Sequence, residues 1–422
     1  LFSFLILFAL TTGHASSPPR PRELLLTVRK DAATQQYVTV IRQRTPEVPV
    51  KLVVDLGGQF LWVDCDRNYI SSSLRNVRCN TAECNLAGNS VACGNNGTTC
   101  SVFPGSPFLT TIGDLVEDVV SVASTDGTNP GPYATVPRFA FACGSTALLH
   151  GLARGATGIA GLGRSRIGVP LQFAADFSFG RKFAICLSSS TAADGVIFIG
   201  GGPYNLISVV PGPLGFQYTP LYVNPVSTAG TYTEGEKSTE YFIGVRSITL
   251  DINTTVPING SLLKIDKKGY GGTKISTVNS YTVLETSIYR SLTSAFVRAS
   301  AARGIRRVPG VAPFEFCFSA GNIGSTRVGP AVPYINLELD GADRPIWTIF
   351  GSNSMVSVKN DAVLCLGFLN GGANPRTAIV IGGYQIEDNL LQFDLDRSRL
   401  GFSSTLLGRE TTCANFNFTV TS

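Results

Sequence analysis

The two halves of this chain repeat one motif spacing, and this repeat limits the folds open to the chain. Asp55, in a Val-Val-Asp-Leu-Gly sequence, lies 106 residues before Gly161 of an Ile-Ala-Gly sequence (161 − 55 = 106). Ser276, in an Ile-Ser-Thr-Val sequence, lies 106 residues before Gly382 of a Val-Ile-Gly sequence (382 − 276 = 106). Equal spacing in both halves predicts two structurally related lobes. With 422 residues, 44% of them hydrophobic, the chain is long enough to form two cores.

The composition favours strands over helices. Only 15% of residues are charged, while 45 are Gly and 23 are Pro, which is typical of many short strands joined by turns. Apolar residues alternate at Val50, Leu52 and Val54, as expected for half-buried strands. One helix is predicted from about Ser287 to Arg303, with Gly304 ending it. We therefore expect an all-β protein with a few short helices, divided into an N-terminal lobe (16–215) and a C-terminal lobe (216–422).

Residues 1–15 resemble a secretory signal peptide. The apolar run at 1–10 is too short to cross a bilayer, and a small-residue and Ser-Pro stretch follows it. No Met or basic segment precedes the run, so we read it as a truncated signal. We expect a soluble, secreted, extracellular protein with no membrane segment. The net charge of +5 is spread along the chain, and its densest run, at 303–307, indicates a solvated helix end and not a nucleic-acid site.

Ten cysteines, an even number in a chain expected to be secreted, indicate five disulfides. Irregular spacing, and the absence of any His between residues 15 and 149, argue against zinc, so we expect no metal site. The pairs we favour, although sequence alone does not fix connectivity, are Cys79–Cys93, Cys84–Cys100, Cys317–Cys365, Cys65–Cys143 and Cys186–Cys413. N-glycosylation sequons begin at four positions, which are Asn96, Asn253, Asn259 and Asn417.

The motif pair at Asp55 and Ser276 carries one carboxylate where a catalytic dyad needs two. Hydrolysis of a peptide bond by paired carboxylates requires both groups to share one proton, and a serine hydroxyl cannot take that part. A serine nucleophile is also disfavoured, because His150, the only His besides His14, falls in the other lobe. The Gly-rich stretches at 161–163 and 200–202 open no helix in a βαβ context, so they predict turns, and we expect no nucleotide or other cofactor. Trp62 and Trp347, the only tryptophans, are interpreted as packing residues and not as a carbohydrate platform.

These motifs together resemble the pepsin-like aspartic proteases of plants. The resemblance rests on Asp55-Leu56-Gly57, on 158–164 and 379–383, and on the stretch from Ser276 to Tyr289, and it covers nearly the whole chain after the leader. It implies a bilobal pepsin-like fold. In proteolytic members a Thr or Ser follows each catalytic Asp and cross-links the two loops, and a flap tyrosine covers the cleft. Here Leu56 follows Asp55, and no Tyr lies between Tyr69 and Tyr133.

Within that family the chain is similar to an inactive plant subgroup. This subgroup includes the extracellular dermal glycoprotein, xyloglucanase inhibitors, basic 7S globulins and wheat xylanase inhibitors. The stretches 324–330 and 405–416 resemble the xyloglucanase-inhibitor branch most. The resemblance implies a defence-related, non-enzymatic monomer of the cell wall. Loops of its second lobe would enter the cleft of a microbial family-12 endoglucanase, with Arg327 and Arg409 as inhibitory contacts.

Two other functions fit the same resemblance. One is a peptide-binding, receptor-like extracellular protein of the basic 7S type, and the other is a residual aspartic protease. In the wheat branch, inhibition of xylanase uses a histidine of the C-terminal lobe. No histidine follows His150 in this chain, which favours an endoglucanase over a xylanase as the target.

Overall fold

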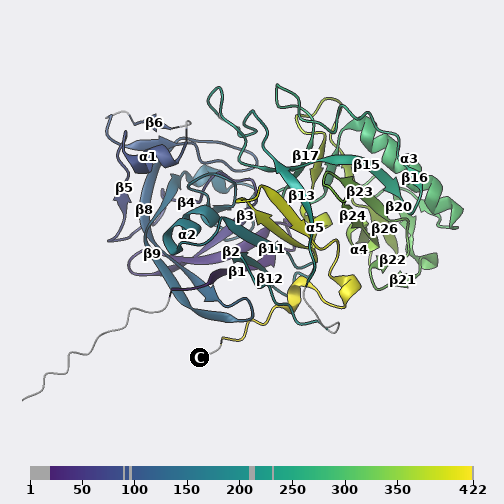
Figure 1. The fold of residues 1–422 in the computed structure, drawn as a ribbon, viewed down its shortest axis with the longest axis horizontal. Coiled ribbons are helices and arrows are strands. Elements are labelled where there is room, and N and C mark those ends of the chain that lie inside the picture. The colour runs from purple at the N-terminus through teal and green to yellow at the C-terminus, as the bar shows by residue number, and fades with distance from the viewer. Residues whose placement is uncertain (1–19, 89–90, 95–96, 209–213, 231, 421–422) are drawn as a thin grey trace, which may run out of the picture.

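The computed structural model describes residues 20–88, 91–94, 97–208, 214–230 and 232–420. The expected signal peptide at 1–15 and the sequon at Asn96 lie outside these residues. The chain forms two β-rich lobes side by side (Figure 1). The strands of the first half are β1 (Glu23–Lys30), β2 (Tyr37–Gln43), β3 (Val48–Asp55), β4 (Trp62–Asp64), β5 (Arg75–Asn76), β6 (Ala92–Cys93), β7 (Cys100–Val102), β8 (Gly113–Thr125), β9 (Pro130–Gly144), β10 (Gly158–Gly161), β11 (Lys182–Cys186) and β12 (Gly195–Ile199).

The second half contributes more and shorter strands. They are β13 (Gln217–Tyr222), β14 (Tyr241–Ile243), β15 (Val245–Leu250), β16 (Thr254–Thr255), β17 (Thr273–Ile275), β18 (Thr282–Leu284), β19 (Arg307–Val308), β20 (Cys317–Ser319), β21 (Ser325–Thr326), β22 (Gly329–Pro330), β23 (Ile335–Leu339), β24 (Ile346–Ile349), β25 (Met355–Val358), β26 (Val363–Leu366), β27 (Phe368–Asn370), β28 (Ile379–Ile381), β29 (Leu390–Asp394) and β30 (Arg399–Phe402). The α-helices are α1 (Ala82–Leu86), α2 (Val169–Phe177), α3 (Thr286–Ala302), α4 (Gly351–Ser354) and α5 (Gly383–Ile386), and the 3₁₀ turns are η1 (Thr146–Leu149), η2 (Ala320–Asn322), η3 (Leu407–Arg409) and η4 (Cys413–Asn415). The expectation of a mostly β protein with few helices is confirmed.

The sequence repeat corresponds to the same strand arrangement in both lobes. In the first lobe β3 runs parallel to β10, and Asp55 pairs with Gly161. In the second lobe β17 runs parallel to β28, and Ile275, just before Ser276, pairs with Ile381, just before Gly382. The equal spacing of 106 residues thus places each motif beside its glycine.

A side chain at either of these two glycines would collide with backbone. A Cβ at Gly161 would lie 2.4 Å from the Phe60 carbonyl oxygen, and one at Gly382 would lie 2.3 Å from the Tyr281 carbonyl carbon. Only glycine permits the chain to cross so closely at these points. The glycines therefore maintain the crossing that presents the two motif loops to each other.

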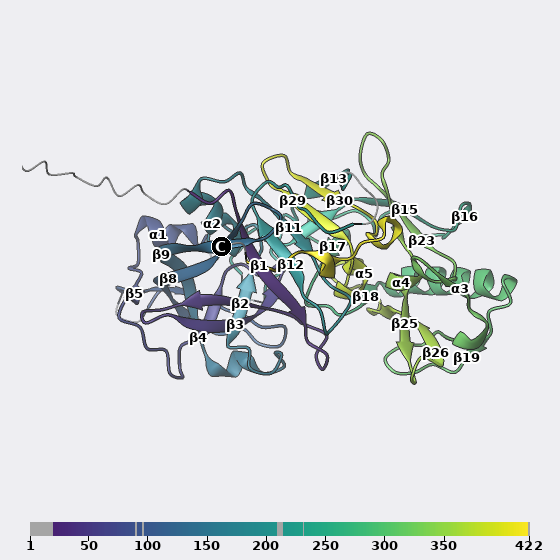
Figure 2. The ribbon, with the colours of Figure 1, turned by 90° about the horizontal axis from the view of Figure 1, so that it is seen from below.

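A shared antiparallel sheet joins the lobes. Its order is β12–β11–β29–β30–β13, so strands of the second half complete a sheet that begins in the first. Phe183 of β11 stacks on Phe393 of β29 with ring centroids 4.7 Å apart, and both side chains are fully buried. Figure 2 shows β29 and β30 between β11 and β13 at the junction. The predicted division at 215/216 falls between β12 and β13 in the chain, and it stays a prediction.

Helix α3 confirms the helix predicted from sequence. Its first turn is capped by the Glu285 carboxylate, which accepts hydrogen bonds from the N–H groups of Ser287 and Ile288. Its buried face includes Ile288, Leu292 and Phe296. Gly304, at φ 72°, follows the helix end. Trp62 and Trp347 are 2% and 1% exposed, so both are packing residues as predicted.

Five disulfides form with the pairing favoured from the sequence, and each joins residues whose Cα atoms lie 4.0–5.8 Å apart. Asn253 and Asn259 are exposed and Asn417 is partly exposed, which leaves their use as glycosylation sites a prediction. Across the described residues, no helix combines the length and apolar character needed to span a bilayer.

Candidate functional site

Asp55 ends β3 on the first-lobe side of the junction between the lobes. Its carboxylate accepts a hydrogen bond of 2.9 Å from the Gly57 N–H. Burial, followed by the negative charge of Glu240, raises the pKa of Asp55 from 3.8 to about 6, against the opposing effects of the Gly57 N–H and Lys274. Asp55 is therefore a desolvated carboxyl held by its own loop.

Ser276 occupies the corresponding loop of the second lobe and is 8% exposed. Its hydroxyl donates to the Asn279 side-chain oxygen at 3.0 Å and accepts from the N–H groups of Val278 and Asn279 at 3.2 Å each. The hydroxyl is thus committed to the turn that it begins. No histidine among the described residues forms a hydrogen bond with it, so Ser276 supplies neither a carboxylate to its loop nor an activated nucleophile.

Thr277 preserves one of the two cross-links expected between the motif loops. Its hydroxyl donates to the Val54 carbonyl at 2.8 Å and accepts from the Leu56 N–H at 2.9 Å. The reciprocal bond is missing because Leu56 has no side-chain donor, and its buried side chain packs in the core instead. As the resemblance implied, the cross-link is lost on one side only.

A charge pair beside Asp55 was not predicted from sequence. Lys274 Nζ lies 2.7 Å from Glu240 Oε1, and the two side chains are only 17% and 21% exposed. Thr228 also donates to the Glu240 carboxylate. A Cβ at Gly57 would come within 2.7 Å of the Glu240 side chain, so Glu240 packs directly on the Asp55 loop. The positive charge of Lys274 thus offsets one of two neighbouring negative charges, those of Glu240 and Asp55.

The polar segment 223–240, which we call the crossing segment, forms no helix or strand among its described residues, and most of them are exposed, as a surface loop would be. Ser227 and Ser238 are nevertheless buried, and the segment contacts the first lobe. The Thr239 hydroxyl donates to the Gly57 carbonyl at 2.9 Å, and the Thr239 carbonyl accepts from the Arg164 N–H at 2.9 Å. Its polar side chains form hydrogen bonds across the junction, which explains why a polar sequence need not lie in solvent.

A hairpin at 104–111, closed by a bridge between Gly105 and Thr110, lies in the region between Tyr69 and Tyr133 that contains no tyrosine. Trp62 Nε1 donates to the Gly105 carbonyl at 2.9 Å, which fixes the base of the hairpin. Its tip carries apolar side chains, with Phe108 67% exposed. Gly230 of the crossing segment packs against this hairpin, and a Cβ at Gly230 would lie 2.7 Å from the Thr110 hydroxyl. The hairpin thus meets the second lobe without presenting a tyrosine.

Arg327 lies at the tip of the β21–β22 hairpin, with 61% of its side chain exposed. The hairpin is held by a bond from the Thr326 hydroxyl to the Gly329 carbonyl at 2.7 Å and by the Ser352 N–H donating to the Val328 carbonyl at 2.9 Å. Arg327 Nη2 lies 2.6 Å from Glu410 Oε1. The structure therefore brings together the stretches 324–330 and 405–416, which the sequence analysis singled out separately.

Arg409 is placed differently from Arg327. It ends η3 and is only partly exposed, and its Nε is buried with no hydrogen-bond partner among the described residues. The Arg409 carbonyl accepts from the Ser208 hydroxyl at 2.9 Å. The acidic neighbour Glu410 pairs with Arg327 and not with Arg409. Arg409 is thus half-enclosed beside the exposed Arg327–Glu410 pair.

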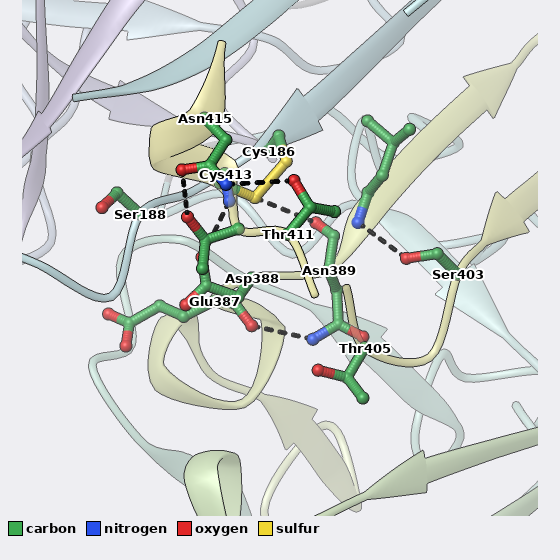
Figure 3. Close-up of a disulfide and its surroundings, with 12 residues drawn as sticks. Cys186, Ser188, Glu387, Asp388, Asn389, Ser403, Thr405, Thr411, Cys413 and Asn415 are labelled. Atoms are coloured by element: carbon green, nitrogen blue, oxygen red, sulfur yellow. Dashed lines mark hydrogen bonds between the residues drawn. A yellow bond between two sulfur atoms is a disulfide. The ribbon is translucent and has the colours of Figure 1, made fainter. Parts of the chain in front are cut away.

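A disulfide fixes the tail that carries Arg409 and Glu410 (Figure 3). Cys413 is bonded to Cys186 of β11, 227 positions away, and its N–H donates to the Asp388 carboxylate at 2.9 Å. The Thr411 hydroxyl donates to the Ile207 carbonyl at 2.6 Å. The C-terminal tail is thereby anchored to the first lobe a few residues after Glu410.

The fold and this site define an aspartic-protease-like protein in which the second-lobe loop equivalent to that of Asp55 carries Ser276. Two family models match the chain, described as xylanase inhibitor N-terminal over residues 37–201 and xylanase inhibitor C-terminal over residues 240–404. These segments make up most of the chain, which therefore belongs to the xylanase-inhibitor family with a pepsin-like fold. The resemblance drawn from the sequence is confirmed.

Individual relatives support the same assignment. The chain is 54% identical to a protein named probable aspartic proteinase GIP2 of Nicotiana benthamiana, covering 99% of this chain and 97% of the relative. It is 34% identical to basic 7S globulin of Glycine max, covering 97% and 96%. Among solved structures, edgp superimposes with a TM-score of 0.91 at 57% identity, covering 95% of this chain and 99% of the other. Soybean basic 7S globulin gives a TM-score of 0.78 at 32% identity, covering 94% and 100%.

Restoring the missing carboxylate is expected to leave the protein without proteolytic activity. In Ser276→Asp, the N–H groups of Val278 and Asn279 would hold a new carboxylate, but Leu56 still lacks its cross-link and the hairpin lacks a tyrosine. Positioning errors of about 1 Å cost on the order of 100-fold in rate. Digestion of acid-denatured haemoglobin from pH 3 to 7, with and without pepstatin, checks this. Pepstatin-sensitive cleavage by the single variant would contradict it.

Proposed function

We propose that this protein is a secreted, proteolytically inactive inhibitor of a microbial glycoside hydrolase. Its target is a family-12 xyloglucan-specific endo-β-1,4-glucanase, whose active cleft receives loops of the second lobe. The observation that carries the proposal is the exposed guanidinium of Arg327, presented on a braced hairpin in a chain of the xylanase-inhibitor family. The protein acts in the extracellular space, as the leader sequence predicts.

The chemistry of the target suits this side chain. A retaining glycosidase holds two carboxyl groups about 5 Å apart across the scissile bond. A guanidinium presents five N–H donors in a planar fork, so it forms charge-assisted hydrogen bonds with both carboxylates at once. Occlusion by Arg327 then requires no reaction. Such an inhibitor does not need the protease chemistry that Ser276 has removed.

The pair between Arg327 and Glu410 prepares the arginine for this contact. Glu410 engages Nη2 at 2.6 Å, and Nε and Nη1 stay available to a partner. The hairpin bonds at Thr326 and Ser352 limit the freedom that would be lost on binding. Preorganisation of this kind increases affinity by reducing the entropy cost of association. Arg409, half-enclosed beside the pair, is proposed as a secondary contact.

Replacing Arg327 is expected to weaken the complex strongly. Arg327→Ala should cost about 2–4 kcal/mol of binding free energy, the range for truncating one partner of a desolvated charge pair. The loss should appear mainly in the dissociation rate, because two enzyme carboxylates are left facing each other without a cation. Titration of a fungal family-12 xyloglucanase against wild-type and variant inhibitor measures the effect. Arg409→Ala should weaken binding less.

Arg344→Ala is the matched control. Arg344 also lies near a second-lobe hairpin tip, is 70% exposed and has only a distant contact with Glu338 at 3.7 Å. Its removal should change affinity by less than about 0.5 kcal/mol. Equal losses of affinity in Arg327→Ala and Arg344→Ala, or no inhibition by the wild type, would contradict the proposed role of Arg327. Retention of a peptide and not of an enzyme from microbial culture filtrate would favour the peptide-binding alternative.

A further inference from the structure

Helix α3 and strand β19 carry a group of arginines that the proposed inhibition does not use. Residues 286–314 include five arginines and no Asp or Glu. Four of them are exposed and have no ion pair among the described residues, and we call them the arginine face: Arg290, Arg298, Arg306 and Arg307. The fifth, Arg303, pairs with Asp251 at 2.6 Å. Figure 2 places α3 and β19 on the outer flank of the second lobe, away from the first lobe.

The periodicity of α3 directs these side chains outward. Arg290, Ser294, Arg298 and Ala302 follow each other at four-residue intervals, and all are exposed. Residues at this spacing lie on one side of a helix, and eight residues span about 12 Å along its axis. Gly304 then turns the chain toward β19, which Arg306 precedes and Arg307 begins, with the Arg307 guanidinium 4.7 Å from the centre of the Phe316 ring. The result is an extended positive face.

Helix stability does not account for this charge. Helix α3 contains no acidic residue, so no ion pair between side chains three or four positions apart supports it. Arg290 lies in the N-terminal third of α3, where the helix macrodipole disfavours a cation. Glu285 and Glu315, which flank the segment, are engaged by the first helical turn and by the Tyr289 hydroxyl. The positive charge is therefore available to a partner.

We propose that the arginine face binds an anionic polysaccharide of the polyuronate type. Its carboxylates recur along an extended chain and match guanidinium groups spread over a comparable length. A membrane surface fits less well, because the large apolar residues of α3 face the core and the outward positions beside the arginines are Ser and Ala. The choice of a polysaccharide over a nucleic acid rests on the extracellular location proposed above.

Binding to immobilised, fully de-esterified polygalacturonate tests the proposal. The wild type should bind at 50 mM NaCl and lose most of its affinity at 200 mM, since the contacts are ionic. Arg290→Gln/Arg298→Gln/Arg306→Gln should lower affinity at least about tenfold, while fully methyl-esterified polymer should not bind. Inhibition of glucanase by this variant should stay unchanged, which separates failure of this surface from failure of the inhibitory one.

The matched control removes the same charge elsewhere. Arg67, Arg78 and Arg154 are exposed on the first lobe and form no ion pair within the described part of the chain. Arg67→Gln/Arg78→Gln/Arg154→Gln should keep most of the affinity. Equal weakening by the two triple variants would mean that net charge alone attracts the polymer, and would overturn the proposal. Absence of wild-type binding, or tighter binding to RNA or to anionic vesicles under the same conditions, would overturn it as well.

Discussion

Lys30→Met is expected to lower the free energy of unfolding by about 3–5 kcal/mol at pH 8, the range for removing one partner of a buried ion pair. Lys30 Nζ lies 2.7 Å from Glu387 Oε1, and the side chains are 8% and 2% exposed. The Tyr37 hydroxyl also donates to Glu387 at 2.7 Å. Because Lys30 and Tyr37 belong to the first half and Glu387 to the second, the cluster fastens the lobes together.

The loss should shrink as the pH falls. Burial raises the pKa of Glu387 from 4.5 to about 7, against the opposing effect of Lys30. Tyr37, Asp388 and Tyr384 also face this cluster. A carboxyl whose pKa is raised on folding stabilises fully below its unfolded pKa, and that contribution is lost as pH rises through its folded pKa. At pH 5 a protonated Glu387 no longer needs Lys30, so the cost should fall to about 1 kcal/mol, that of one neutral hydrogen bond.

Urea unfolding at pH 5 and pH 8 measures both effects. The free energy of unfolding of the wild type should itself be lower at pH 8 than at pH 5, because burial also raises the pKa of Glu23 to about 7. Arg29→Met is the control, since Arg29 pairs with Asp194 at 2.6 Å on the surface, with exposures of 57% and 24%. It should cost below about 1 kcal/mol at both pH values. An equal cost for Lys30→Met at pH 5 and pH 8 would refute the role assigned to the Glu387 charge.

The architecture could be predicted from sequence because it depends on local pattern and on spacing. The interval of 106 residues in each half indicated related lobes, and it fixes the pairing of Asp55 with Gly161 in β3 and β10. Alternating apolar residues predicted strands, and the stretch from Ser287 to Arg303 with Gly304 after it predicted helix α3. These features follow from backbone geometry and from the chemistry of a few residues.

The site was only partly predictable, because its defining contacts join residues far apart in the chain. The loss at Ser276 and the missing donor at Leu56 were visible as residue types. The pairs Lys274–Glu240 and Arg327–Glu410 join residues 34 and 83 positions apart (274 − 240 = 34; 410 − 327 = 83), and nothing in their local sequences marks them as partners. Only the packing of the crossing segment and of the C-terminal tail brings these charges together.

Removing the Cys186–Cys413 disulfide is expected to be among the most destabilising changes in the protein. The bond closes a loop of 227 positions, for which the chain-entropy relation gives about 5 kcal/mol of stabilisation. Cys79–Cys93 closes only 14 positions and should contribute about 3 kcal/mol. Urea unfolding of Cys186→Ala/Cys413→Ala beside Cys79→Ala/Cys93→Ala measures the difference.

The Cys186→Ala/Cys413→Ala variant should also weaken inhibition, because the tail released from its disulfide carries Glu410. Without the bond to β11, only noncovalent contacts hold the tail, among them the hydrogen bonds to Asp388 and from Thr411 and the ring contact between Phe198 and Phe416, so the partner that positions Arg327 is less firmly fixed. Affinity for the glucanase should fall about 3- to 10-fold, less than in Arg327→Ala, since the guanidinium is still present. The Cys79→Ala/Cys93→Ala variant, whose bond lies in the first lobe, should inhibit as the wild type does. Equal inhibition by both disulfide variants would show that the tail does not position Arg327.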